Sequence, residues 1–275
     1  MDVDYFAQIW EENEHEGHSY TKGNSNMWDR RVEEFNRDEP DERIERITSL
    51  LLEKKMLNPN STVLDIGCGP GKFVMAFAQT AKNVTGVDIS PKMLQAAAEN
   101  AVAKRLDNTD FKELDWKTAD LTALKWKKRF SLITAIMSPA LDSKECLDKM
   151  LEASNEYCLI SHFVRRNDSI LDELKRNILH RQTVDEFSNK MLYCSFNILW
   201  LYKIFPEIVY FDTERETSRT LEEASSHYIK RLELKEELTP TQKANVLDFL
   251  KGKVEKGVIK EKTTAKIACI YWKNE

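Results

Sequence analysis

Two carboxylates stand where they could hold a ligand. Asp65 ends a short apolar run just before a glycine-rich turn, and Asp88 ends a second such run 23 residues later. The turn, "VLDIGCGPG" at 63–71, has glycine at three of its last five positions. A glycine-rich turn after a strand usually cradles a phosphate against backbone N–H groups. A carboxylate at its mouth opposes that use, so these residues indicate a ligand that is not simply anionic.

The glycine spacing departs from both common phosphate-binding patterns. The dinucleotide fingerprint GxGxxG is met at Gly67 and Gly69, but Lys72 takes the place of the third glycine and Gly71 comes one residue early. The phosphate loop GxxxxGK[ST] is absent. Asp65 would also repel a pyrophosphate at the N-terminus of the following helix. A nicotinamide-dependent dehydrogenase is therefore only a weak alternative.

A ligand with a cation at one end and a sugar at the other suits both carboxylates. Asp65 would attract an ammonium or a sulfonium, while the glycines let the ligand lie against the backbone. A carboxylate in the position of Asp88 typically accepts hydrogen bonds from the ribose hydroxyls. S-adenosylmethionine combines these groups, so we predict it as the cofactor.

The two motifs in this order resemble the class I S-adenosylmethionine-dependent methyltransferase family. "VLDIGCGPGKF" is followed by "VTGVDIS" and "PKML", and the resemblance covers about residues 60–165. It implies an α/β fold with a Rossmann-like seven-stranded sheet, mostly parallel with an antiparallel C-terminal strand, and helices on both faces. The final "AKIACIYW" suits that last strand.

The resemblance also implies roles for individual residues. The methionine portion would face Asp65, Gly67, Cys68 and Gly69, and the ribose would face Asp88. The adenine would contact Ile89, Met93, Asp115 and Trp116. The sulfonium would be bordered by Ala135, Ile136 and Met137. Some of these residues also fit a plain structural role. Asp115 could be an ordinary turn residue, Cys68 a small residue in a tight loop, and the two methionines part of the core.

The apolar pattern along the chain supports an alternating α/β fold. Residues 61–165 alternate short β-branched runs with helical patterns, which is typical of βαβ units and a parallel sheet. Ser90 and Pro91 mark the start of one of these helices. We expect strands at 62–66, 83–88, 109–115, 130–137 and 156–163. Farther along, we expect helices at 169–180, 184–205, 218–232 and 239–254, a strand at 207–211 and an edge strand at 263–272.

The segments outside this alternation are expected to recognise the methyl acceptor. We predict an N-terminal helical cap at 1–60 and an S-adenosylmethionine-binding domain at 61–275, with a helical insertion at about 166–205 as lid or substrate wall. In relatives the N-terminal helices often close over the ligand, which makes Tyr20 and Trp28 candidate cofactor contacts. The alternative for Trp28 is a place in the core.

Methyl transfer to a good nucleophile needs no catalytic triad, because alignment alone can supply roughly 7–11 kcal/mol. The catalytic candidates are Tyr20 and His162, which lies at the end of the fifth expected strand and could act as a base. A surface histidine is the simpler interpretation. Enzymes that methylate exocyclic nucleobase nitrogens resemble one another in an [ND]PP[YF] motif, which "AIMSPAL" does not match. We therefore expect a small-molecule acceptor. The alternatives are an RNA or protein acceptor, or a protein that binds S-adenosylmethionine without turnover.

The bulk composition gives no indication of a nucleic-acid or membrane partner. The formal net charge is −5 and 41% of residues are hydrophobic. Five cysteines lack the spacing of a zinc site, so we expect no metal and a reduced, cytoplasmic protein. The most apolar stretch, 191–205, contains Lys203 and is shorter than the ~20 residues of a membrane span. It could form a lid or an interface, so a monomer and a homodimer both stay open.

Overall fold

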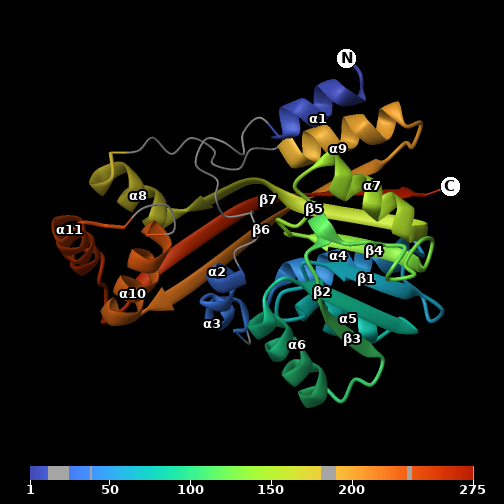
Figure 1. The fold of residues 1–275 in the computed structure, drawn as a ribbon. Helices are drawn as coiled ribbons and strands as arrows, with labels where there is room; N and C mark the ends of the chain where they lie inside the picture. Colours follow the sequence, from blue (N-terminus) through green and yellow to red (C-terminus); the bar gives the residue numbers. More distant parts are fainter. Residues whose placement is uncertain (12–24, 38, 181–189, 234–236, 275) are drawn as a thin grey trace. The chain divides into compact units, whose positions relative to one another are not determined.

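The computed structural model describes residues 1–11, 25–37, 39–180, 190–233 and 237–274. The chain divides into two compact units (Figure 1). Unit 1 comprises Met1–His162, Asn189–Val209 and Ala268–Glu275, and unit 2 comprises Phe163–Ser188 and Tyr210–Ile267. The division into a cap at 1–60 and an insertion at about 166–205 stays a prediction.

A seven-stranded sheet has the order β3-β2-β1-β4-β5-β7-β6. Its strands are β1 Thr62–Ile66, β2 Asn83–Asp88, β3 Thr109–Glu113, β4 Phe130–Ile136, β5 Ser154–Asp168, β6 Glu207–Arg219 and β7 Ile259–Lys273. The pairs β1–β2, β2–β3, β1–β4 and β4–β5 are parallel, and β7 runs antiparallel to its neighbours. The predicted fold class is confirmed.

The strand order reverses between β1 and β4, and this reversal determines where the helices lie. The helices of unit 1 are α1 Val3–Glu11, α2 Ser25–Asp29, α3 Val32–Phe35, α4 Glu42–Glu53, α5 Lys72–Ala78, α6 Pro91–Ala103, α7 Lys144–Ala153 and α9 Lys190–Leu201, with a 3-10 turn η1 at Trp116–Thr118. Right-handed crossovers place α5 and α6 on one face of the sheet and α7 on the other. In open parallel sheets, ligands bind outside the carboxyl ends of the strands at such a reversal.

The N-terminal helices pack on unit 1 in two places. Helix α1 contacts α9 and buries Phe6 and Trp10. The short helices α2 and α3 contact α6 instead. Helix α6 begins as predicted, with Pro91 in its first turn and the Ser90 side chain accepting a hydrogen bond from the Met93 N–H.

Unit 2 has its own apolar core. Its helices are α8 Ser169–Ile178, α10 Leu221–Leu232 and α11 Pro240–Lys251, and they enclose a cluster that includes Leu174, Tyr228 and Leu250. Thr239 caps α11, and Pro240 follows it in the first turn of the helix. The predicted strand ends were wrong here, because β5, β6 and β7 continue into unit 2. His162 therefore lies inside the 15-residue strand β5 rather than at its end.

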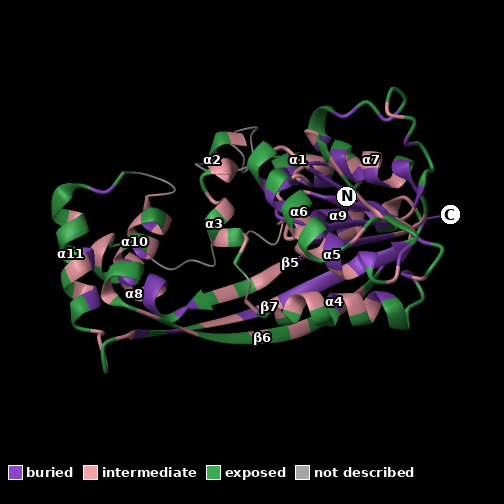
Figure 2. Ribbon diagram, turned by 90° about the horizontal axis from the view of Figure 1, so that it is seen from below, coloured by how far each residue is buried: buried purple, intermediate pink, exposed green. Residues whose placement is uncertain are grey.

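Burial differs between the central and outer strands (Figure 2). The core strand β4 is buried at six of its seven positions, whereas β6 consists of exposed and half-buried residues. All five cysteines are buried and free. In the part of the chain that the structure describes, no helix is both long enough and apolar enough to cross a membrane.

Candidate functional site

A buried carboxylate lies where the strand order reverses. Asp65 of β1 stands in register with Thr134 of β4, whose hydroxyl donates a 2.7 Å hydrogen bond to it. The side chain is only 3% exposed. Burial raises the pKa of Asp65 to about 7, the Thr134 hydrogen bond lowers it, and the nearby Asp88 charge raises it further. Among the described residues no lysine or arginine pairs with Asp65, so its charge is available to a cationic ligand.

Three glycines with positive φ shape the loop after β1, and they differ in what surrounds them. The φ values are +69° at Gly67, +54° at Gly69 and +78° at Gly71. A Cβ on Gly67 would lie 2.0 Å from the Ser138 Oγ, and one on Gly71 would lie 3.0 Å from the Ala97 Cβ. A Cβ on Gly69 would meet no atom within 4 Å. Gly67 and Gly71 therefore allow close packing, while the backbone at Gly69 is open to a ligand.

Asp88 connects this loop to helix α6. One carboxylate oxygen accepts a 2.9 Å hydrogen bond from the Gly69 N–H, and the other accepts one of 2.9 Å from the Ser90 N–H. Burial raises the pKa of Asp88, and these backbone N–H groups oppose that rise. Each oxygen of an ionised carboxylate has about two acceptor sites, so Asp88 can still accept from ligand hydroxyls.

The segment carrying α2 and α3 is fastened to the same region. The Ser90 hydroxyl donates a 2.6 Å hydrogen bond to Asp29 in α2. The Asn100 side-chain amide in α6 donates to both the Asn36 side chain, at 2.7 Å, and the carbonyl of Pro70 in the glycine loop, at 2.9 Å. These hydrogen bonds link the N-terminal segment to the residues that hold the loop.

Trp28 packs against its own segment. The Arg31 guanidinium lies 5.3 Å from the Trp28 ring centroid and 4.7 Å from that of Phe35, and it pairs with Glu34 at 2.9 Å. The Trp28 side chain is half-buried, so it is not a core residue and keeps some accessible surface. Its contact with the cofactor stays a prediction, and Tyr20 lies outside the described residues.

The predicted adenine contacts lie at the ends of β2 and β3. Ile89 is half-buried and Met93 is buried. Asp115 accepts a 2.9 Å hydrogen bond from the Lys117 N–H and so caps the 3-10 turn η1. Trp116 is 1% exposed and donates through Nε1 to the Cys146 carbonyl at 3.1 Å. The Trp116 ring is thus part of the packed interior, and these adenine contacts stay predictions.

The residues at the end of β4 lie next to the glycine loop, where Ser138 packs against Gly67. Ala135 and Ile136 are buried, and Met137 has a φ of +52°, which is uncommon for a residue other than glycine. The Met137 N–H donates to the Ser161 carbonyl at 2.8 Å. His162 follows Ser161 in β5 and is half-buried.

Cys68 does not offer a reactive thiolate. Its side chain is 8% exposed, and burial together with the charges of Asp65 and Asp88 raises the pKa of the thiol well above its ordinary value. The thiol stays protonated near neutral pH. Its place in the tight loop agrees with the packing role considered from the sequence.

Three further residues belong to this region but were missed in the sequence. Thr134 supports Asp65, Ser138 packs against Gly67, and Asp29 binds Ser90. Each contact joins residues more than sixty positions apart in the chain. Only the strand register and the docking of α2 reveal them.

The chain matches a family model described as a methyltransferase domain over residues 57–245. A 23S rRNA (uracil(1939)-C(5))-methyltransferase of Shewanella sediminis is 33% identical over 119 residues, which is 42% of this chain and 27% of that protein. A probable cobalt-precorrin-6B C(15)-methyltransferase (decarboxylating) of Methanobrevibacter smithii is 39% identical over 56 residues, 20% of this chain and 30% of that protein.

Among solved structures, the YcgJ protein of Bacillus subtilis is similar in fold. Its TM-score is 0.51 with 17% sequence identity, and the superposition covers 84% of this chain and 99% of that one. The chain spans less than a third of the length of the two curated relatives above.

Proposed function

Because this chain belongs to the methyltransferase domain family, we propose that it transfers a methyl group from S-adenosylmethionine to a small-molecule acceptor. The observation that carries this proposal is the buried, cation-free carboxylate of Asp65 beside the open backbone of Gly69. The Asp65 carboxylate offers a negative charge to an ammonium, and the open backbone at Gly69 lets a ligand approach the loop.

The residues around the loop fit S-adenosylmethionine. Asp65 would bind the ammonium of its methionine portion and Asp88 the ribose hydroxyls. Ile136 and Met137, at the end of β4, would border the sulfonium. When bound, S-adenosylmethionine supplies an electrophilic methyl group.

The chain's own contribution to the reaction is alignment and exclusion of water. Asp88 holds the loop through Gly69 and the start of α6 through Ser90, so the residues that orient the cofactor are fixed to one another. His162 stays the candidate base for acceptors that must lose a proton, and Tyr20 stays a catalytic candidate without an assigned role. Acceptors that are already good nucleophiles need no base, because alignment alone can supply roughly 7–11 kcal/mol.

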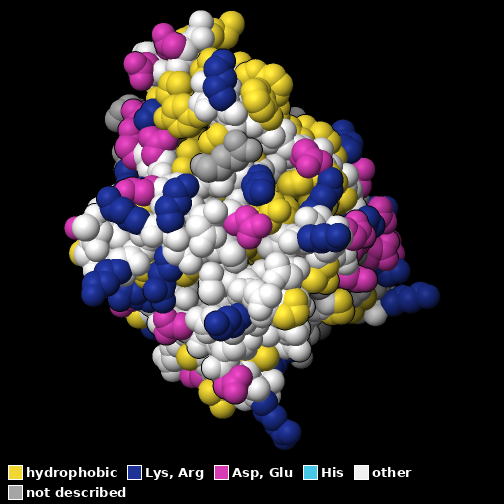
Figure 3. Space-filling model, turned by 90° about the vertical axis from the view of Figure 1, so that its right-hand side faces the viewer, with side chains coloured by type: hydrophobic (Ala, Val, Ile, Leu, Met, Phe, Trp, Pro, Cys, Tyr) yellow, Lys and Arg dark blue, Asp and Glu magenta, His cyan; other side chains and the backbone are white. Residues whose placement is uncertain are grey.

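An RNA acceptor is the second candidate, and the Shewanella rRNA methyltransferase is the observation that favours it. That similarity is confined to 42% of this chain. On the face shown in Figure 3, lysine and arginine side chains are interspersed with aspartate and glutamate, and hydrophobic side chains gather toward the top. Phosphate backbones are usually bound by a continuous basic patch, which this face lacks. We favour the small molecule because the formal net charge of −5 gives no sign of the overall basic character that is typical of phosphate-backbone binding. Cytoplasmic location also stays a proposal.

Transfer of a radioactive methyl group separates the candidates. The purified chain is incubated with methyl-tritiated S-adenosylmethionine and, in parallel, with a protein-free metabolite extract, total RNA or denatured protein. We expect label in the metabolite fraction, and much less of it with Asp88→Ala at a cofactor concentration that does not saturate the variant. Label confined to RNA would replace the small-molecule proposal with the RNA acceptor. Cofactor binding without label in any fraction would indicate a binding protein.

A further inference from the structure

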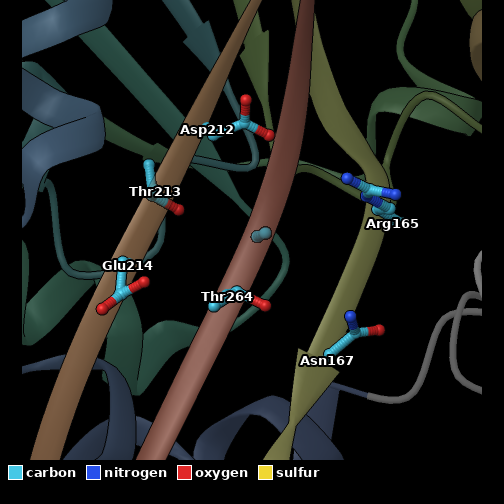
Figure 4. A pocket seen from close by; sticks show the side chains of 7 residues that line it. Arg165, Asn167, Asp212, Thr213, Glu214 and Thr264 are labelled. Carbon is cyan, nitrogen blue, oxygen red and sulfur yellow. The ribbon is translucent and has the colours of Figure 1, made fainter.

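A polar hollow lies in unit 2, formed by the extended parts of three strands (Figure 4). Its volume is about 180 Å³. The lining residues are Arg165 and Asn167 of β5, Asp212, Thr213 and Glu214 of β6, and Thr264 and Ala265 of β7. At roughly 30 Å³ for each water in the liquid, the space equals about six waters, which suits a small metabolite.

The strands beneath this hollow are held firmly from their other face. Successive side chains of a strand point to opposite faces, so the residues that alternate with the lining residues point away from the hollow. Among these, Asp168 of β5 pairs with Arg231 of α10 at 2.6 Å, and Glu261 of β7 pairs with Arg219 of β6. Both carboxylates are buried. A polar site carried on strands that are fixed in this way is preorganised.

The three strands contribute different chemistry to the hollow. In β6, Asp212 pairs with Lys266 at 3.2 Å and Glu214 pairs with Lys262 at 2.7 Å. The two carboxylates nevertheless stay 68% and 56% exposed. Because a carboxylate has about four acceptor sites, each can accept further hydrogen bonds. Across the hollow, Arg165 has no ion pair with any described residue.

The lining also contains neutral polar side chains, among them Asn167 and Thr264. The Asn167 amide and the Thr264 hydroxyl make no hydrogen bond to another described side chain or backbone group. Figure 4 shows Arg165 and Asn167 one after the other along β5, with Thr264 of β7 between β5 and the carboxylates of β6. A guanidinium beside an amide is a donor set for a carboxylate or phosphate. The β6 side offers acceptors for an ammonium.

We propose that this hollow binds a small zwitterion, with its acidic group at Arg165 and Asn167 and its ammonium at Asp212 and Glu214. The ligand class is an amino carboxylate or an amino phosphate of a few heavy atoms. The two lysine-paired carboxylates and the unpaired arginine give the site a net charge of about +1, which favours a ligand that is neutral or anionic overall. This binding site goes beyond the proposed reaction and stands whichever acceptor the enzyme methylates.

Nuclear magnetic resonance can test binding and position together. The ¹⁵N-labelled full chain is titrated with β-alanine and with O-phosphoethanolamine, and the Arg165 Nε–H and Asn167 side-chain signals are followed. We expect at least one probe to shift both signals with saturation. In Arg165→Ala the affinity, followed at Asn167, should fall about tenfold, since charge-assisted hydrogen bonds are lost. Asp212→Asn should also weaken binding.

The controls decide whether the hollow recognises both charges. Arg176→Ala removes an exposed arginine of α8 outside the hollow, and it should leave the affinity unchanged. Propionate and ethanolamine carry only one of the two charges each, and they should bind more weakly than β-alanine. Equal affinity for propionate and β-alanine would overturn the proposal that the hollow recognises a zwitterion. Absence of any shift at Arg165 and Asn167 with both zwitterions, or unchanged affinity in Arg165→Ala, would overturn the site.

Discussion

Burial of Asp65 makes the ligand-free protein sensitive to pH. The ordinary pKa of an aspartate is 3.8, and burial raises that of Asp65 to about 7 in the folded chain. Between these values the folded chain keeps a proton that the unfolded chain has lost, so stability falls as pH rises through this window and levels off above about 7. The full loss is about 4 kcal/mol. Urea unfolding between about pH 5 and about pH 8 should show this decline in the wild type.

The variant Asp65→Asn separates stability from cofactor binding. We expect it to be more stable than the wild type above about pH 7, with a flatter pH profile, because it has no buried charge. Its affinity for S-adenosylhomocysteine should be lower, because the ammonium loses its partner. A gain in stability with a loss of binding marks a residue kept for function. A variant that binds normally would remove Asp65 from the site.

Asp88 carries the predicted ribose contact. Replacing it by alanine should weaken binding of S-adenosylhomocysteine by about tenfold or more, since hydrogen bonds to charged groups contribute about 1.5–3 kcal/mol each. Calorimetric titration measures the effect. Asp110→Ala, at an exposed position of β3, is the matched control and should bind as the wild type does. Unchanged affinity in Asp88→Ala would exclude the ribose assignment.

The Asp29 carboxylate links helix α2 to the cofactor region. Asp29 accepts from the Ser90 hydroxyl at 2.6 Å and lies near enough to raise the pKa of Asp88. In Asp29→Ala we expect α2 to be less protected in hydrogen exchange and cofactor affinity to fall several-fold, with global stability nearly unchanged. Glu33→Ala, exposed on α3, is the control. Equal protection of α2 in both variants would show that Asp29 does not hold it.

Among the helices and strands, the sequence predicts those of unit 1 better than those of unit 2. The strands up to β4 were placed almost to the residue, because apolar β-branched runs bounded by turns are local signals. The ends of β5, β6 and β7 were missed, because "RRND", "TERETSR" and "IKEK" are polar and look like loops. They form strands since their charges pair across the sheet, as Arg219 does with Glu261.

The site residues also divide into those that a local sequence motif predicts and those that only the folded structure brings together. Asp65 and Asp88 lie near the ends of their strands, in a motif that can be recognised along the sequence. Thr134 and Asp29 act on them from positions that only the strand register and the helix docking bring close. The hollow of unit 2 could not be predicted for the same reason, because β5, β6 and β7 bring its lining residues together only in the folded chain.

Across the whole molecule, the two units have separate cores, and unit 2 depends on buried charges. Arg231 is 17% exposed and Asp168 only 3% exposed. Burial acts to raise the pKa of Asp168, but Arg231 and the Leu171 N–H outweigh it and hold the pKa below its ordinary value. Removing one partner of a buried ion pair costs about 3–5 kcal/mol, because the other charge stays buried without compensation.

The variant Arg231→Ala should therefore loosen unit 2 while unit 1 keeps its structure. In hydrogen exchange we expect α8, α10 and α11 to lose protection, while β1 to β4 and the affinity for S-adenosylhomocysteine stay as in the wild type. The control Lys251→Ala breaks an exposed pair with Asp248, which contributes less than about 1 kcal/mol. If β1 to β4 lose protection to the same extent as α10, the two units unfold as one cooperative body, and the separate cores do not confer separate stability.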